Sequence, residues 1–258
     1  MKTETRKNCL ILGSGRSGTS LLAGTLYRAG YYMGKDLLPA NKDNPKGFFE
    51  AREVNAINET LLSEVTRSHP TDNTAVPPDS VRWGWRWLAD VPVGTHIPCS
   101  RPVARHIEAL TGNIPFCFKD PRFCYTLQVW LPSLSNCVFL CVFRDPAHTA
   151  NSIVKVCERG EYLHGLKLSF DEALQRWTLM YRHVLDVHRH QGDWLFLHYR
   201  QIFDGSAIPR LEKILNTAIK HDFVDATLER SVHNGLVPAE VMAVYRELCD
   251  LAQYPGDE

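Results

Sequence analysis

Short apolar runs alternate with longer amphipathic stretches along this chain, and the alternation predicts strands and helices in turn. Val138–Phe143 is a continuous apolar run, which is typical of a parallel strand that is covered on both faces. This order predicts an α/β fold with a central parallel sheet flanked by helices. The predicted strands are Cys9–Gly13, Pro115–Lys119, Val138–Phe143 and Trp194–His198, and the main predicted helices are Thr19–Ala29, Arg52–Glu64, Val103–Leu110, Phe123–Leu131 and Phe170–His190.

The chain has 258 residues, which is enough for one large domain with a substantial core. No internal repeat or linker divides it, so we expect a single domain over residues 1–258. A stretch at about residues 66–112 breaks the pattern and is expected to form an insertion or lid on the substrate side. Within it, Trp83, Trp85 and Trp87 stand at every second position. Both an aromatic lid over a cleft and the packing of a short strand explain this period.

A glycine-rich loop follows the first predicted strand and leads directly into a helix. Gly13, Gly18 and Ser20 fit the nucleotide-binding pattern G-x-x-x-x-G-K-[ST], but Thr19 stands where that pattern has its lysine. The cation of the loop is Arg16, so the charge lies at the middle of the loop. Backbone N–H groups and the helix N-terminus favour an anion here. The sequence therefore predicts phosphate binding by Gly15, Arg16, Ser17, Gly18, Thr19 and Ser20.

A second anion site is predicted at the end of the apolar run Val138–Phe143. Arg144 follows this run directly, at the carboxyl end of a strand, where ligands bind in open α/β sheets. Ser152 comes eight residues later, about two helical turns along. We therefore expect Arg144 and Ser152 to hold a second phosphate together.

With these two motifs the chain resembles the sulfotransferases that use 3′-phosphoadenosine 5′-phosphosulfate (PAPS). That family has a phosphosulfate loop with Lys or Arg before Ser-Gly-Thr, and Arg16 stands in this place. The family also has a strand that ends in Arg, followed eight residues later by Ser, as Arg144 and Ser152 are here. Tyr199, at the end of a late strand, is a third similarity. The resemblance covers about residues 8–200 and implies a P-loop NTPase-like sulfotransferase fold, PAPS as donor, 3′,5′-adenosine bisphosphate (PAP) as product, and no metal.

Sulfuryl transfer calls for a cation at the leaving oxygen and a general base at the acceptor. Arg16 is expected near the leaving oxygen, and Lys119 near the sulfuryl group. Glycan-type and several bacterial sulfotransferases place a glutamate base in the part of the fold where this chain has Glu50. The resemblance therefore favours Glu50 as the base, in Gly47-Phe-Phe-Glu50 just before a predicted helix.

Other interpretations of these residues stay open from the sequence alone. Asp120 is the second candidate base, or a helix cap that orients Arg122. The cytosolic sulfotransferases have a base histidine at this strand end, and this chain has none. Glu50 is alternatively a residue that stabilises the following helix through its dipole, and Lys119 a surface lysine that ends a strand.

Composition argues against several classes of function. Lys and Arg number 29, and Asp and Glu also number 29, so no overall field favours nucleic acid or an acidic membrane. The chain shows no membrane-length apolar stretch and no apolar signal segment, so we expect it in the cytoplasm. Its eight cysteines form no C-x-x-C pair, and neither zinc nor disulfides are expected. His188 and His190 are expected to end a helix, where a cation suits the dipole.

The sequence therefore predicts an enzyme that moves a sulfuryl group from PAPS to a hydroxyl or amine of a small-molecule or carbohydrate acceptor. The main alternative is a nucleotide-dependent kinase or NTPase, which needs Mg²⁺ ligands and usually the P-loop lysine. A nucleotide-binding scaffold without activity is a further alternative. The sequence determines neither the acceptor nor the oligomeric state.

Overall fold

The computed structural model describes residues 5–42, 44–66, 84–159, 163, 166–224 and 235–256. Within this part of the chain, four parallel strands form one sheet in the order β2–β1–β3–β4. All four predicted strands are confirmed, with each end shifted by no more than two residues. The strands are β1 Asn8–Leu12, β2 Cys117–Lys119, β3 Cys137–Phe143 and β4 Asp193–His198.

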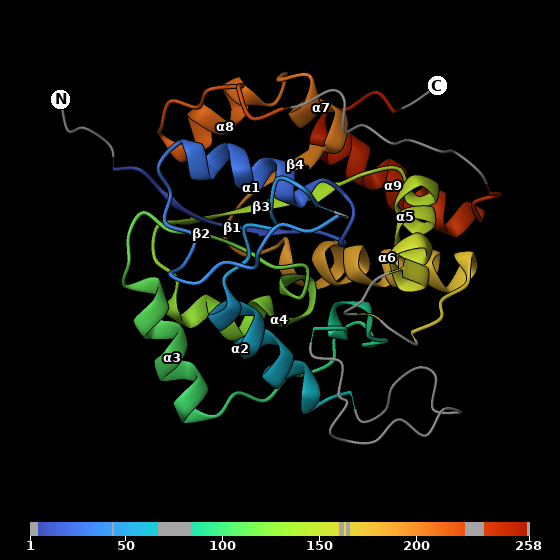
Figure 1. Cartoon of the computed structure of the whole chain (residues 1–258), viewed down its shortest axis with the longest axis horizontal. Helices are drawn as coiled ribbons and strands as arrows, with labels where there is room; N and C mark the ends of the chain where they lie inside the picture. Colours follow the sequence, from blue (N-terminus) through green and yellow to red (C-terminus); the bar gives the residue numbers. More distant parts are fainter. Residues whose placement is uncertain are drawn as a thin grey trace.

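Helices cover both faces of the sheet (Figure 1). They are α1 Thr19–Arg28, α2 Arg52–Ser63, α3 Arg101–Thr111, α4 Phe123–Trp130, α5 Pro146–Arg159, α6 Phe170–Arg182, α7 Tyr199–Phe203, α8 Ile208–Leu215 and α9 Ala239–Ala252. In the figure α1, α7 and α8 lie on one side of the sheet, and α2, α3, α4 and α6 lie on the other. β1 alternates accordingly: Cys9 and Ile11 join one apolar core, whereas Leu10 and Leu12 join the other. The predicted layered α/β architecture is confirmed.

The tryptophan-rich stretch does not form the short strand that its period of two suggested. Arg86–Leu88 is a single 3₁₀ turn, and Trp85 and Trp87 are both buried in the apolar core. Trp83 lies outside the described residues, as does the first part of the expected lid, residues 67–83. The later part of that stretch contains α3.

The predicted helix Phe170–His190 consists of two segments. α6 ends at Arg182, and His183–His188 continues as a π-helical turn. His188 is buried, and its Nε2 lies 3.0 Å from the carbonyl oxygen of Cys124. Burial lowers the pKa of His188 to about 4. His188 is therefore neutral at pH 7, and the interpretation of this residue as a cation at the helix end is wrong.

None of the helices in the described part of the chain is long and apolar enough to cross a membrane. All eight cysteines carry free thiols, and six of them are buried. They therefore act as small apolar side chains in the core.

Candidate functional site

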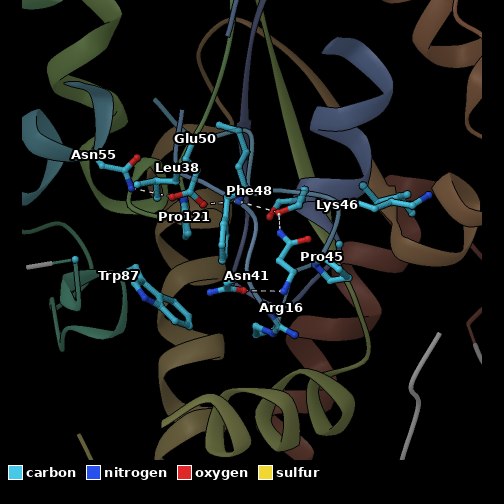
Figure 2. Close-up of a pocket in the computed structure, with 18 of the residues that line it drawn as sticks. Arg16, Leu38, Asn41, Pro45, Lys46, Phe48, Glu50, Asn55, Trp87 and Pro121 are labelled. Carbon is cyan, nitrogen blue, oxygen red and sulfur yellow. Dashed lines mark hydrogen bonds and ion pairs between the residues drawn. The ribbon is translucent and has the colours of Figure 1, made fainter. Parts of the chain in front are cut away.

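A cavity of about 520 Å³ lies at the carboxyl ends of the strands, the edge where ligands bind in open parallel sheets. Each strand contributes to its lining. Arg16 lies in the loop after β1, Lys119 ends β2, Arg144 follows β3 and Tyr199 follows β4. The loop over residues 38–50 closes another side of the cavity, so segments far apart in the sequence meet here (Figure 2).

The lining of this cavity is strongly cationic, although the chain as a whole is neutral. Among the described residues that line it, Glu50 is the one acidic side chain. Positive side chains concentrated in a cleft attract anions, and a polyanionic ligand suits them best. The six cationic residues are Arg16, Lys46, Arg52, Lys119, Arg122 and Arg144.

The loop after β1 needs glycine at two positions for steric reasons. Gly13 has φ +136°, and a Cβ there would lie 2.0 Å from the carbonyl oxygen of Val142. Gly18 has φ +90°, and a Cβ there would lie 2.5 Å from the ring of Tyr199. Both residues therefore take a conformation that suits glycine, and the chain passes close to β3 and to Tyr199 before α1 begins.

Tyr181 of α6 holds the same loop from the side of the core. Its hydroxyl oxygen accepts a hydrogen bond from the backbone N–H of Ser14 at 3.1 Å. It also lies 2.7 Å from the carbonyl oxygen of Val142 and 3.2 Å from Oγ of Ser17. The side chain of Ser17 is thus engaged with Tyr181, and Ser17 is not among the described residues that line the cavity.

The residues predicted for two separate phosphates lie close to one another. Nε of Arg16 donates a hydrogen bond to Oγ of Ser152 at 3.0 Å. The guanidinium carbon of Arg144 lies 4.5 Å from the centroid of the Tyr199 ring, which is a cation–π contact. Arg16, Arg144 and Tyr199 line the cavity, and Ser152 adjoins it through Arg16. Arg16 itself has φ +73°, a conformation that costs energy for any residue other than glycine.

Glu50 lies in a cluster of polar groups on the opposite wall. Nζ of Lys119 forms an ion pair with Oε1 of Glu50 and donates to Oγ of Ser20 at 3.2 Å. Nδ2 of Asn55 donates to Oε2 of Glu50 at 2.8 Å, and Figure 2 shows these two side chains pointing toward one another. Lys119 is only 4% exposed, so it is no surface lysine. The cluster links the candidate base to the phosphate loop through Lys119 and Ser20.

Apolar side chains surround Glu50 on the cavity side. Leu38, Phe48 and Pro121 lie around it in Figure 2, and Trp87 faces them. A Cβ at Gly15 would lie 2.6 Å from the ring of Trp87, so this ring packs directly against the phosphate loop. Such a wall excludes water and strengthens electrostatic interactions inside the cavity.

Asp120 has different surroundings from Glu50. It is fully buried, and its Oδ1 accepts hydrogen bonds from N and Nη1 of Arg122 at 2.8 and 2.9 Å. Burial raises the pKa of Asp120, and the charge of Arg122 opposes this effect. Arg122 also pairs with Glu59 at 2.6 Å, and Glu59 pairs with Arg86 at 2.9 Å. Asp120 is not among the described residues that line the cavity, and its contacts match the alternative in which it orients Arg122.

Comparisons with known proteins identify the fold. No protein-family model and no curated protein sequence matches the chain. The sulfotransferase domain from the olefin synthase of Synechococcus PCC 7002 matches it with a TM-score of 0.53 and 14% identity, over 100% of this chain and 99% of that domain. The sulfotransferase domain from the curacin biosynthetic pathway matches with a TM-score of 0.53 and 13% identity, over 98% and 99%. The chain has the sulfotransferase fold.

Within this sulfotransferase fold the structure brings most of the predicted site residues together. Nine of them line the cavity: Gly15, Arg16, Gly18, Thr19, Ser20, Glu50, Lys119, Arg144 and Tyr199. Ser17, Ser152 and Asp120 are not among the described lining residues. Sequence reasoning missed Asn55 and Lys46, which line the cavity from α2 and from the loop before it. A single sequence carries no signal for either, because both stand in ordinary polar positions.

Proposed function

We propose that this chain is a PAPS-dependent sulfotransferase that acts on a hydroxyl or amine of a small-molecule or carbohydrate acceptor. One observation carries the proposal. A single cavity contains a phosphate loop with its own arginine, a second cationic site after the neighbouring strand, and one buried carboxylate. Two solved domains with this fold, those of the olefin synthase and the curacin pathway, are themselves named sulfotransferase domains.

The proposed donor fits the residues that line the cavity. The backbone N–H groups of the loop and Arg16 suit a 5′-phosphosulfate, since the loop ends at the N-terminus of α1. Arg144, with Ser152 beside the cavity, suits a 3′-phosphate because a guanidinium binds phosphate oxygens in a fork geometry. Thr19 in place of the P-loop lysine argues against a Mg-nucleoside triphosphate at the same loop.

Glu50 is the proposed general base. As the acceptor oxygen or nitrogen forms its bond to sulfur, the bond between sulfur and the 5′-phosphate oxygen breaks. The acceptor proton passes to Glu50, and the electron pair of the broken bond stays on the phosphate, giving PAP. Arg16 and the loop amides stabilise the charge that grows on this leaving oxygen, and Lys119 lies near enough to Glu50 and Ser20 to contact the sulfuryl group.

Ligand-induced stabilisation tests the proposal directly. We expect PAP to raise the melting temperature and AMP, which lacks the 3′-phosphate, to raise it much less. A ligand that binds only the folded state, at a hundredfold its Kd, stabilises that state by about 2.7 kcal/mol. Equal shifts from PAP and AMP, or a larger shift from Mg-ATP, would contradict the assignment and favour an NTP-dependent enzyme. Radiolabelled PAPS with a panel of phenols, alcohols, amines and sugars then identifies the acceptor.

A further inference from the structure

Helix α2 carries two buried asparagines, Asn55 and Asn58, one turn apart on the same face. Each donates a hydrogen bond from its side chain to a carboxylate, Asn55 to Glu50 and Asn58 to Asp120. Each carboxylate in turn pairs with a buried cation, Lys119 or Arg122. The structure thus contains two similar units side by side, and their differences indicate what each one does.

The unit around Asn58 is complete. Nδ2 of Asn58 donates to Oδ2 of Asp120 at 3.0 Å. Its Oδ1 accepts hydrogen bonds from Oγ1 of Thr126 and Nε1 of Trp130, each at 2.9 Å. Asn58 is 0% exposed and does not belong to the described cavity lining. These contacts tie α2 to α4 and account fully for an asparagine at this position.

Asn55 lacks such a complete set of partners. Its Nδ2 donates to Glu50, but its buried Oδ1 has no hydrogen-bond partner among the described residues. Chemistry fixes this orientation of the amide, because an ionised carboxylate only accepts hydrogen bonds and so must face the NH₂ group. A buried carbonyl without a partner lowers stability, and packing alone would favour an apolar side chain here. Asn55 also lines the cavity, unlike Asn58.

We propose that Asn55 is a positioning residue that holds the Glu50 carboxylate in place for proton transfer. The inference rests on the proposed function, in which Lys119 contacts the sulfuryl group. Lys119 bridges Glu50 and Ser20 of the phosphate loop, and a sulfuryl oxygen would be a third acceptor that shares the charge of the same ammonium group. The carboxylate then depends on a second anchor, and the amide of Asn55 on α2 supplies it.

The test uses PAPS with water as the acceptor, so that no acceptor needs to be known. A water oxygen bonds to sulfur as the sulfur–phosphate oxygen bond breaks, Glu50 takes the water proton, and PAP and sulfate are released. We expect Asn55→Leu to slow single-turnover PAP release about tenfold to a hundredfold, since a misplacement of about 1 Å can cost this much.

Two measurements separate positioning from a structural role. Asn55→Leu should leave the calorimetric Kd for PAP and the melting temperature nearly unchanged, and it should cause no further loss in a Glu50→Gln background. The matched control Asn58→Leu should lower the melting temperature and leave the rate per folded molecule unchanged. A crystal structure of Asn55→Leu with PAP should show the Glu50 carboxylate displaced.

Three results would overturn the role of Asn55. These are an unchanged rate in Asn55→Leu, an equal loss in the Glu50→Gln background, and a Glu50 carboxylate that keeps its position in the crystal structure. If the wild-type protein neither binds PAP nor releases it from PAPS, the proposed function itself fails, and the role of Asn55 with it. A wild-type protein that does both, beside an Asn55→Leu variant that matches it, overturns the role of Asn55 alone.

Discussion

Glu50 and Asp120 are both buried carboxylates beside a cation, yet their surroundings suit them to different tasks. Glu50 lines the cavity, where a substrate atom can reach it, whereas Asp120 is fully buried and is not among the described residues that line the cavity. A general base must lie within hydrogen-bond reach of the proton that it takes. Access therefore favours Glu50, even though the sequence offered both residues.

Substitution of the two carboxylates should separate their roles. We expect Glu50→Gln to keep its fold and its affinity for PAP while turnover falls about 10²–10⁴-fold, which is the usual effect of losing a positioned base. Asp120→Asn should instead reduce the free energy of unfolding, on the order of 3 kcal/mol, because it leaves the charge of Arg122 only partly paired. Rates per folded molecule and urea denaturation curves measure both effects. A larger loss of turnover in Asp120→Asn than in Glu50→Gln would transfer the role of base to Asp120.

Arg144 is the residue on which binding of the 3′-phosphate should depend most. We expect Arg144→Ala to weaken PAP binding by about 2–4 kcal/mol, since it removes a charge-assisted fork of donors. Arg144→Lys should recover only part of the loss. Ser152→Ala should cost about 1 kcal/mol, as for a single neutral hydrogen bond. Calorimetry with PAP measures these changes in affinity. The control is Arg189→Ala, which removes a surface ion pair with Glu247 and should leave the affinity for PAP unchanged. An unchanged Kd in folded Arg144→Ala would move the 3′ site elsewhere.

At the scale of elements, the phosphate loop depends on α6 for its shape. Tyr181→Phe removes the hydroxyl that accepts a hydrogen bond from Ser14 and donates one to Val142. Both backbone groups are then left without this partner, which should lower the free energy of unfolding by about 1–3 kcal/mol. We expect the variant to lose affinity for PAP as well, because the loop is no longer held. Tyr125→Phe removes a buried hydroxyl that donates to Ala89 at 3.2 Å, away from the cavity. It should cost similar stability and leave PAP affinity intact. Equal PAP affinity in both variants would show that Tyr181 only supports the core.

Local patterns made the strands and the phosphate loop predictable. Val138–Phe143 signals a covered strand by its own composition, and the spacing of Gly13 and Gly18 signals an anion loop, since both features lie within a few residues. The parallel sheet and the sulfotransferase fold followed from these motifs and from the resemblance that they carried. Thus most residues that the sequence proposed for phosphate binding are found together in the lining of one cavity.

Contacts between distant residues could not be predicted in the same way. Lys119 pairs with Glu50 across 69 positions of sequence, and Trp87 packs on Gly15 across 72. The sequence suggested that Asp120 orients Arg122, but no spacing in it predicts that Arg122 also pairs with Glu59, or Glu59 with Arg86. The same limit explains the error at His188, where a position near a helix end suggested a cation and packing against α4 buries the ring.

At the scale of the whole molecule, positive and negative side chains balance in number, but positive ones are in excess around the cavity. Lys and Arg equal Asp and Glu in number, yet six of the seven charged residues among the described cavity lining are cationic. Several acidic residues of the described part of the chain form surface ion pairs outside this lining, such as Lys7–Asp193. The cavity therefore presents a favourable field to an anionic ligand, which suits binding of a polyanion.

The stability of the whole fold should fall as the pH falls below 7, with His188 as a main cause. Burial depresses the pKa of His188 from 6.5 to about 4, and burial also lowers the pKa of His183. Between these values the unfolded chain binds a proton that the folded chain does not, so unfolding becomes easier as the pH decreases. For His188 the loss amounts to about 3 kcal/mol between pH 7 and pH 4. Urea denaturation across this range should therefore show that the stability of His188→Gln depends less on pH than the stability of the wild-type protein. Asp120 also has a raised pKa, but it is present in both proteins, so its effect cancels in the comparison. Parallel curves for the two proteins would mean that His188 accepts its proton without unfolding the chain.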